Sequence, residues 1–474
     1  MTTPEKLATH QKALHINLDA KKYGTFAEIG AGQEVARWFF HVGGAAGTVA
    51  KTISAYDMGV SDAIYGTCER YVSRQRLVAM LNYEYNLAVE RLQATRGSKC
   101  QLFAFANTVA TRSYTRHEDG HGWLGVRFQT ECHGEPSEII VHVRLLDQEA
   151  VREQEALGVL GVNLLYAAFY QNQQPEVLIG ALLDQLDGGR IEVDMIRFSG
   201  PAFAKVDNRL MSLQLVHQGL TEATMFTAEG EVVQAADALY KKAVLIERGS
   251  FRPIINTTLD MLERAQEQIV EEPEMKGESP LVLMEMTLRS LVSESGIDHQ
   301  DFLARVDTLS ALGKTVMISN FRRYYRLAGY LGRYTHKRTG IVLGIPSLRE
   351  IFDEKFYTDL EGGLLESLGK LFRNEVKLYA YPWRDPATGE VITAANLEVA
   401  PHLRKLYAFL LDNGSIRPIL RHNIEYLPIS SRDVLSKIQC GNREWEKLVP
   451  PAVVAMIKQN GFFGYQEQPM GDQI

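Results

Sequence analysis

Short apolar runs alternate with amphipathic segments along most of the chain beyond residue 240. Such runs, each followed by a segment with helical spacing of its apolar residues, are typical of a parallel α/β sheet whose strands are buried on both faces. The pattern predicts strands at Ala243–Arg248, Leu281–Met286, Thr315–Ser319, Ile341–Ile345 and Val376–Tyr381.

The first part of the chain follows a different pattern, in which apolar and polar residues alternate along longer runs. Alternation of this kind predicts strands that are half buried, and turn residues between them favour an antiparallel meander. The predicted strands are Gln101–Tyr114, Gly122–Glu131 and Ile139–Leu146, with further strands at Ile191–Phe198 and Leu210–Val216.

The change of pattern divides the 474 residues into three expected parts. Residues 1–150 are expected to form an α+β domain with the antiparallel meander, residues 151–425 an α/β domain, and residues 426–474 a helical C-terminal segment. The fold class is therefore α/β, with a mixed α+β part ahead of a mostly parallel sheet. A chain of this length can bury more than one core.

Polar residues stand at the carboxyl ends of three predicted parallel strands. Ligands of such sheets bind beyond the carboxyl ends of the strands, so these residues are candidates for a binding site. Loop chemistry or helix capping is the alternative interpretation. The candidates are Glu247 with Arg248, Glu285 with Thr287 and Arg289, and Ser319 with Asn320.

The charge balance restricts the partners. A formal net charge of −7 argues against broad electrostatic capture of nucleic acid or of an anionic membrane. No run reaches the roughly 18 apolar residues of a membrane span, and the polar N-terminus lacks the apolar core of a signal peptide. The cysteines are far apart and form no Cys-x-x-Cys pair, which favours reduced thiols, a cytoplasmic location and no structural zinc.

One basic segment, residues 321–338, is rich in arginine and tyrosine. Basic and aromatic side chains together can stack bases and hold phosphates, which is the nucleic-acid interpretation. On a helix the same composition more commonly forms an amphipathic face with arginine stems over tyrosine rings. The acidic balance of the whole chain favours the amphipathic helix.

A glycine-rich stretch, residues 23–57, contains Glu28-Ile29-Gly30-Ala31-Gly32. This string resembles the first motif of Rossmann-type methyltransferases, and the resemblance implies a site for S-adenosylmethionine. The residues before Glu28 are few and polar for a central parallel strand. A tight turn leading into a helix over Gln33–His41 is the interpretation that the residues favour.

Two histidines and two acidic residues gather at His117-Glu118-Asp119-Gly120-His121. Imidazole and carboxylate groups suit transition metals, which would make this a metal site. Consecutive side chains in a turn rarely converge, however, and Asp-Gly between two strand-like runs is typical of a hairpin. We therefore expect a solvated hairpin tip and no tightly bound metal or flavin.

A hexapeptide recurs in the chain, as Gly249–Ile254 and as Gly414–Ile419. The shared pattern is Gly-Ser-x-Arg-Pro-Ile, so Arg252 and Arg417 are expected to project from similar turns. Guanidinium groups match carboxylate and phosphate geometry, which makes both arginines candidate ligand contacts. Structural hydrogen bonding to nearby carbonyls is the alternative.

The C-terminal stretch Ile429–Tyr465 contains two adjacent serines before a helical run, then Leu-Val-Pro-Pro before a second one. It resembles the C-terminal segment of nicotinate-nucleotide adenylyltransferases, which opens on Ser-Ser-Thr and grips ATP phosphates. The resemblance implies that Ser430, Ser431 and Arg432 hold a triphosphate, with ATP and Mg²⁺ as cofactors. The His-x-Gly-His element of that family has no match near the N-terminus or directly upstream of this stretch. The whole chain also resembles an uncharacterised bacterial protein family.

Two functions remain open. The first is a nucleotide-binding protein, in its specific form an adenylyltransferase-like enzyme that acts on a pyridine mononucleotide with ATP, with Arg252 or Arg417 holding the second substrate. The second is a non-catalytic binding or assembly protein of the bacterial cytoplasm. A small nucleotide is the expected partner in the first case, and homo-oligomerisation is left open in both.

Overall fold

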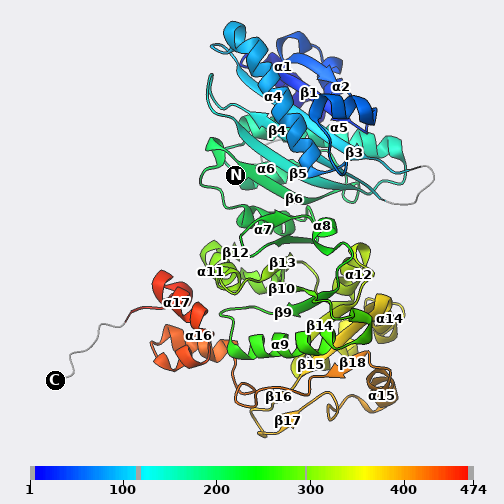
Figure 1. Ribbon diagram of the computed structural model, residues 1–474, viewed down its shortest axis with the longest axis vertical. Helices are drawn as coiled ribbons and strands as arrows, with labels where there is room; N and C mark the ends of the chain where they lie inside the picture. The colour runs from blue at the N-terminus through cyan, green and yellow to red at the C-terminus, as the bar shows by residue number, and fades with distance from the viewer. Residues whose placement is uncertain (1–5, 114–118, 294–295, 468–474) are drawn as a thin grey trace, which may run out of the picture. The chain divides into compact units, whose positions relative to one another are not determined.

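The computed structural model describes residues 6–113, 119–293 and 296–467, and it contains two compact units (Figure 1). The first unit is Met1–Thr224 and the second is Met225–Ile474. The expected boundary at residue 150 falls inside the first unit, because strands on both sides of it belong to one sheet. Within the described ranges, no helix combines the length and apolar content that crossing a membrane requires.

The first unit contains a six-stranded sheet in the order β2-β1-β3-β4-β5-β6. Strand β1 pairs in parallel with both β2 and β3, whereas β3 to β6 form an antiparallel meander. The meander was predicted, and β6 extends it by one strand. The strands are β1 (Lys22–Ile29), β2 (Val49–Ile53), β3 (Gln101–Ala110), β4 (Gly120–Phe128), β5 (Ser137–Leu145) and β6 (Ile191–Ser199).

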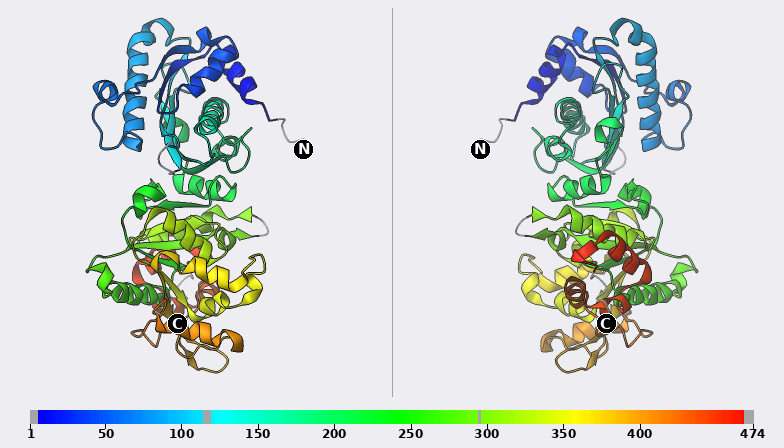
Figure 2. Two further views of the ribbon diagram at one scale, coloured as in Figure 1. Left: turned by 90° about the vertical axis from the view of Figure 1, so that its right-hand side faces the viewer. Right: turned by 90° about the vertical axis from the view of Figure 1, so that its left-hand side faces the viewer.

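Helices cover both faces of this sheet (Figure 2). Leu81 of α4 packs over Gly125 of β4, and α5 packs over the other face, where Gly161 approaches Phe105. The core on the α5 side is a continuous cluster of buried apolar residues. The helices are α1 (Thr9–Leu18), α2 (Glu34–His41), α3 (Met58–Tyr65), α4 (Arg74–Arg96), α5 (Ala150–Tyr170), α6 (Pro175–Ala181) and α7 (Asn208–His217).

Two elements of this unit differ from the sequence predictions. The predicted strand Leu210–Val216 is part of α7, which begins after Asp207, whose carboxylate accepts a hydrogen bond from the N–H of Arg209. The segment before Glu28, predicted to be too polar for a central parallel strand, is β1. Lys22 of this strand donates to the Gln101 side chain, which lets it enter the sheet, whereas the buried Thr25 hydroxyl has no hydrogen-bond partner among the described residues.

The second unit contains an eight-stranded sheet in the order β18-β15-β14-β9-β10-β13-β7-β8. The strands from β18 to β13 are all parallel, which confirms the predicted mostly parallel sheet. The strands are β7 (Ala223–Phe226), β8 (Val232–Val233), β9 (Val244–Arg248), β10 (Leu281–Thr287), β13 (Thr315–Ser319), β14 (Thr339–Gly344), β15 (Val376–Tyr381) and β18 (Ile416–Pro418).

The parallel strands are arranged as in a doubly wound sheet. Numbered in chain order, β9, β10, β13, β14, β15 and β18 lie in the order 3-2-1-4-5-6. The chain therefore leaves the central strand β9 in one direction and returns to the other side of it at β14. That reversal opens the carboxyl edge of the sheet beside β9, and it is the position where such sheets bind ligands.

Helices pack on both faces of this second sheet (Figure 2). The longest, α9, follows β9 directly and packs against β14, and α12 packs against α14. Short hairpins β11–β12 and β16–β17 lie outside the main sheet. The helices are α8 (Ala235–Leu239), α9 (Asn256–Val270), α10 (Leu288–Leu291), α11 (His299–Ser310), α12 (Tyr324–Tyr334), α13 (Ile345–Ile351), α14 (Gly363–Leu371) and α15 (Arg404–Asp412).

The C-terminal segment is helical, as predicted, and belongs to the second unit. It contains α16 (Ser431–Gln439), a 3₁₀ helix over Arg443–Lys447 and α17 (Pro451–Asn460), which packs against α11. Trp445 is 1% exposed and anchors the segment. Burial of so large a side chain makes the segment part of the core of this unit.

Candidate functional site

The serines of the C-terminal segment contact the backbone of the β9–α9 loop. The Ser431 hydroxyl lies 3.0 Å from the carbonyl oxygens of Arg252 and of Pro253. Ser430 is the N-cap residue of α16, but its side chain makes no capping hydrogen bond. Ser431 and Arg252 therefore do lie together, but the contact is to the Arg252 backbone and not to its guanidinium group. The hydroxyl holds the C-terminal segment against the β9–α9 loop.

The N-terminus of α9 is also covered by the C-terminal segment. The Asn256 N–H donates to the Leu448 carbonyl and the Asn256 side chain to the Lys447 carbonyl, each at 3.0 Å. The Thr257 hydroxyl donates to the Tyr426 carbonyl at 2.8 Å. The first helix after the central strand is a common phosphate site in doubly wound sheets. Here its leading N–H group and its first side chains already have protein partners.

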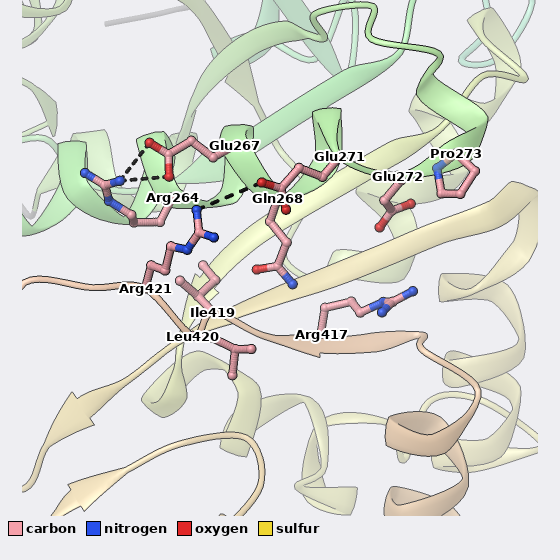
Figure 3. A pocket seen from close by; sticks show the side chains of 10 residues that line it. All are labelled: Arg264, Glu267, Gln268, Glu271, Glu272, Pro273, Arg417, Ile419, Leu420 and Arg421. Atoms are coloured by element: carbon pink, nitrogen blue, oxygen red, sulfur yellow. Dashed lines mark hydrogen bonds and ion pairs between the residues drawn. The ribbon is translucent and has the colours of Figure 1, made fainter.

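The remaining candidate arginines lie in different surroundings. Arg252 pairs through Nε with Asp301 at 2.5 Å. Arg417 lies on β18 and lines a hollow of about 360 Å³ beside α9, with Glu272 and Gln268 among its other lining residues (Figure 3). Arg432 is exposed. The repeated hexapeptide therefore does not direct its two arginines at one ligand, and Arg417 enters a hollow that Arg252 does not line.

A second hollow lies at the carboxyl edge of the sheet, where the sequence predicted a site. We call it the strand-end hollow. Its lining residues come from the ends of β9, β10 and β13 and from α12 and α13, and four of them are arginines beside one glutamate. The polar lining residues are Arg248, Thr287, Arg289, Asn320, Arg322, Arg323, Tyr324, Ser347, Glu350 and Tyr357.

Arg248 is held at the base of this hollow by a buried carboxylate. Its Nε and Nη2 atoms each lie 2.8 Å from one oxygen of Glu285, which is fully buried on β10. The Ser319 hydroxyl at the end of β13 donates to the same carboxylate at 2.5 Å. Although burial disfavours its charge, the Glu285 carboxylate raises the pKa of Arg248 above its ordinary value.

Aromatic rings support the same cluster. The Arg248 guanidinium lies 4.5 Å from the ring centre of Tyr324, and that of Arg323 lies 4.3 Å from the ring centre of Phe356. Burial raises the pKa of Tyr324, so its hydroxyl stays protonated at neutral pH. Stacking on a ring keeps a guanidinium in one plane and leaves its edge for hydrogen bonds to an anion.

The three polar strand ends that the sequence offered as candidates lie at this edge, except for Glu247. That side chain projects to the face opposite Arg248, because neighbouring residues alternate along a strand. It is 2% exposed, and burial raises its pKa well above the ordinary value. Within the described residues its Oε2 atom has no hydrogen-bond partner. Glu247 therefore lies outside the hollow, in surroundings that disfavour its charged form.

Arg322, Arg323 and Tyr324 were predicted as part of the basic segment 321–338, but not as part of this site. They follow Ser319 and Asn320 directly, so the strand-end rule could have included them. Tyr324 begins α12, which is strongly amphipathic with Leu327 and Leu331 buried, and Arg322 and Arg323 directly precede this helix. The basic segment is therefore an amphipathic helix, and its first residues line the hollow.

The glycine-rich turn of the first unit holds a side chain of its own. The Glu28 carboxylate accepts hydrogen bonds from the N–H groups of Val35 (3.2 Å) and Ala36 (2.8 Å) in the first turn of α2, and from the Asn107 side chain at 2.9 Å. Burial raises the pKa of Glu28 to about 7. A Cβ on Gly30 would lie 1.8 Å from the Val109 carbonyl oxygen, so only glycine fits the turn. The tight turn and the helix after it are confirmed.

The cluster at 117–121 is described only in part, because His117 and Glu118 lie outside the described residues. Asp119 pairs with Arg144 at 2.8 Å, and His121 lies 3.4 Å from His142. Over the described ranges, no three histidine, cysteine or acidic residues are grouped so as to hold a metal ion.

Comparison with known proteins gives distant likenesses only. No protein-family model and no curated protein matches the chain. Among solved structures, a competence/damage inducible protein from Agrobacterium tumefaciens is 17% identical, covers 35% of this chain and 98% of its own, and has a TM-score of 0.25. A competence-damaged protein (CinA) superfamily protein from Enterobacter cloacae is 14% identical, covers 35% of this chain and 96% of its own, and has a TM-score of 0.26. Neither is a nicotinate-nucleotide adenylyltransferase, and both are too distant to assign a function.

Proposed function

We propose that the second unit binds a nucleotide, with the phosphate groups in the strand-end hollow. The observation that carries the proposal is the convergence of Arg248, Arg289, Arg322 and Arg323 at the carboxyl edge of a sheet with the doubly wound strand order. Arginine forks match phosphate oxygens, and the reversal of strand order beside β9 is where such sheets place their ligands. The fold supports the place of the site, and the arginines support the charge of the ligand.

The contacts of the C-terminal segment shift the proposed phosphate site away from Ser430 and Ser431. The Ser431 hydroxyl is directed at two carbonyl oxygens. A phosphate oxygen is also an acceptor, so it would compete with these carbonyls for the same hydroxyl. A phosphate at the same hydroxyl would have to displace the docked segment. The strand-end hollow requires no such displacement. Adenylyl transfer from ATP to a pyridine mononucleotide is the finer form of the proposal.

Calorimetric titration of the full chain with ATP–Mg²⁺ and with nicotinate mononucleotide tests the site. We expect Arg322→Ala to weaken ATP binding by roughly tenfold, about 1.4 kcal/mol, because it removes a charge-assisted contact. Arg333→Ala is the matched control, since Arg333 is an exposed arginine on α12, the helix that begins two residues after Arg322, and it lies outside the lining. A double Ser430→Ala, Ser431→Ala variant should bind as the wild type does. If only the double serine variant loses ATP binding, the phosphates bind at the C-terminal segment and not in the strand-end hollow.

A non-catalytic binding or assembly protein is the second candidate. It is favoured by the covered N-terminus of α9, since the N–H of Asn256 and the hydroxyl of Thr257 have protein partners there. An assay for pyrophosphate release from ATP in the presence of nicotinate mononucleotide separates the two candidates. Tight binding of nucleotide without turnover would support the binding protein.

A further inference from the structure

We propose that the strand-end hollow takes two adjacent phosphate groups of its ligand, with Arg248 as a fixed contact and Arg289 and Arg322 as contacts paired only on binding. This inference rests on the proposed function and specifies which part of the nucleotide enters the hollow. In this arrangement Arg248 is held in position before the ligand binds, whereas Arg289 and Arg322 are not.

Arg248 is positioned before any ligand arrives. Two hydrogen bonds to Glu285 use its Nε and Nη2 atoms, and Nη1 lies outside that pair. Glu285 is itself fixed by the Ser319 hydroxyl and is fully buried. A guanidinium held in this way loses little conformational freedom on binding, which lowers the entropic cost of the contact. Glu285 and Ser319 are positioning residues that act through Arg248.

Arg289 and Arg322 are arranged differently. Both line the hollow and both are exposed. Within the part of the chain that the structure describes, neither has a carboxylate partner, whereas Arg248 has one. Of the four arginines that line the hollow, Arg248 is already paired with Glu285, so an entering anion supplies the acceptor that Arg289 and Arg322 lack. A diphosphate brings more negative charge and more acceptor oxygens than a single phosphate, so it can engage all three arginines at once.

The size of the hollow supports the same assignment. Its volume is about 220 Å³. Sites that enclose a whole small-molecule ligand commonly measure roughly 300–1,000 Å³. A compact diphosphate group fits the smaller space, and the sugar and base of a nucleotide would lie outside the arginine cluster. Selection by this hollow would therefore act on the phosphate chain.

Inorganic anions test this directly on the full chain, without a base or a sugar. Calorimetry at one ionic strength with phosphate, pyrophosphate and citrate should give a pyrophosphate dissociation constant at least tenfold below that of phosphate. Arg289→Ala and Arg322→Ala should each reduce that preference to about threefold or less. Arg333→Ala, the control arginine on α12, should leave it unchanged.

The positioning role of Ser319 has its own readout. Ser319→Ala should weaken phosphate and pyrophosphate binding by a similar factor, about threefold, because it acts through Arg248, which contacts either anion. The preference for pyrophosphate should then stay as in the wild type, and the unfolding temperature without ligand shows that the variant folds. A change in the preference would overturn this role.

The outcomes separate this inference from the proposed function. If neither phosphate nor pyrophosphate binds the wild type, the proposed function fails with the inference. If both bind equally well, the hollow holds a single phosphate, and only the diphosphate assignment is wrong. If citrate binds as tightly as pyrophosphate, the hollow is a general anion site, which also overturns the assignment.

Discussion

The two units treat the first turn after a central parallel strand in different ways. In the first unit, β1 leads into α2, and the N-terminal N–H groups of α2 bind the Glu28 side chain from that same strand. In the second unit, β9 leads into α9, whose start binds carbonyl oxygens of a segment 191 residues further along the chain. Both helix starts are satisfied, one by a local carboxylate and the other by distant neutral groups.

The two helix starts therefore have different kinds of partner, although each helix follows a parallel strand. A helix N-terminus beside a parallel strand is a ready site for an anion, and in the first unit a buried carboxylate already occupies it. In the second unit neutral carbonyls contact the start of α9, and four arginines, one of them paired with Glu285, line the strand-end hollow instead. Under the proposed function, the ligand would enter the strand-end hollow and not the start of α9, which has protein partners of its own.

The largest expected change in stability comes from Glu28, the titratable side chain at the start of α2 in the first unit. The folded pKa of Glu28, about 7, lies above the model value of 4.5 that stands for the unfolded chain. Its stabilising contribution is therefore complete below pH 4.5 and is lost as the pH rises through 7. We expect the free energy of unfolding of the first unit to fall by about 2.5 kcal/mol between pH 5 and pH 8 from this group.

Urea unfolding at the two pH values measures this loss, with Glu28→Gln as the variant that cannot titrate. Trp38 and Trp123 report the first unit, and Trp383 and Trp445 the second, once the other pair is replaced by phenylalanine. The variant should lose the pH dependence of the first unit and leave that of the second unchanged. An equal slope in wild type and variant would show that Glu28 does not titrate in this range.

A smaller effect is expected from the neutral cap of α9. The substitutions Thr257→Val and Ser431→Ala remove two hydroxyls that hold the C-terminal part of the chain in place. Thr257 donates to the Tyr426 carbonyl, and Ser431 donates to the β9–α9 loop. Each bond contributes about 1 kcal/mol, so the second unit should lose about 2 kcal/mol, equally at pH 5 and pH 8. Hydrogen exchange should rise at α16 and at the start of α9. Exchange unchanged at α9 would mean that the segment does not protect that helix start.

The smallest effects come from the repeated hexapeptide, whose two arginines form a matched pair. Arg252 binds Asp301, which also binds the buried Arg305, whereas Arg417 is exposed on β18. We expect Arg252→Ala to cost about 1 kcal/mol and Arg417→Ala less than about 0.5 kcal/mol in urea unfolding. Equal costs would show that the two turns are equivalent after all.

The sequence predicted the second sheet well because its strands are continuous apolar runs, a signal that depends on few distant partners. Arg248, Thr287 and Asn320 were candidates from the positions of the strand ends, and they share one hollow because carboxyl ends of parallel strands meet at one edge. Periodicity failed at Leu210–Val216, where a short run rich in leucine fits a strand or a helix.

The features that could not be predicted depend on partners far away in the chain. Lys22 is acceptable in β1 because its ammonium donates to the Gln101 side chain, 79 residues later in the chain, and lies over the Phe169 ring. The serines of the C-terminal segment resembled a phosphate site, yet the acceptors of Ser431 are carbonyls 178 and 179 residues earlier. Local sequence identifies a hydroxyl that can donate, but not the acceptor that it finds.

The docking of the C-terminal segment also affects how the protein is made. The Asn256 side chain finds its acceptor 191 residues later, so the ribosome must complete nearly all of the second unit before that contact can form. At about 5–20 residues per second, the start of α9 waits roughly 10–40 s for its partner during synthesis. A nascent chain in this interval carries an open helix end, and a message that stops before codon 426 would lack the acceptors of both Asn256 and Thr257.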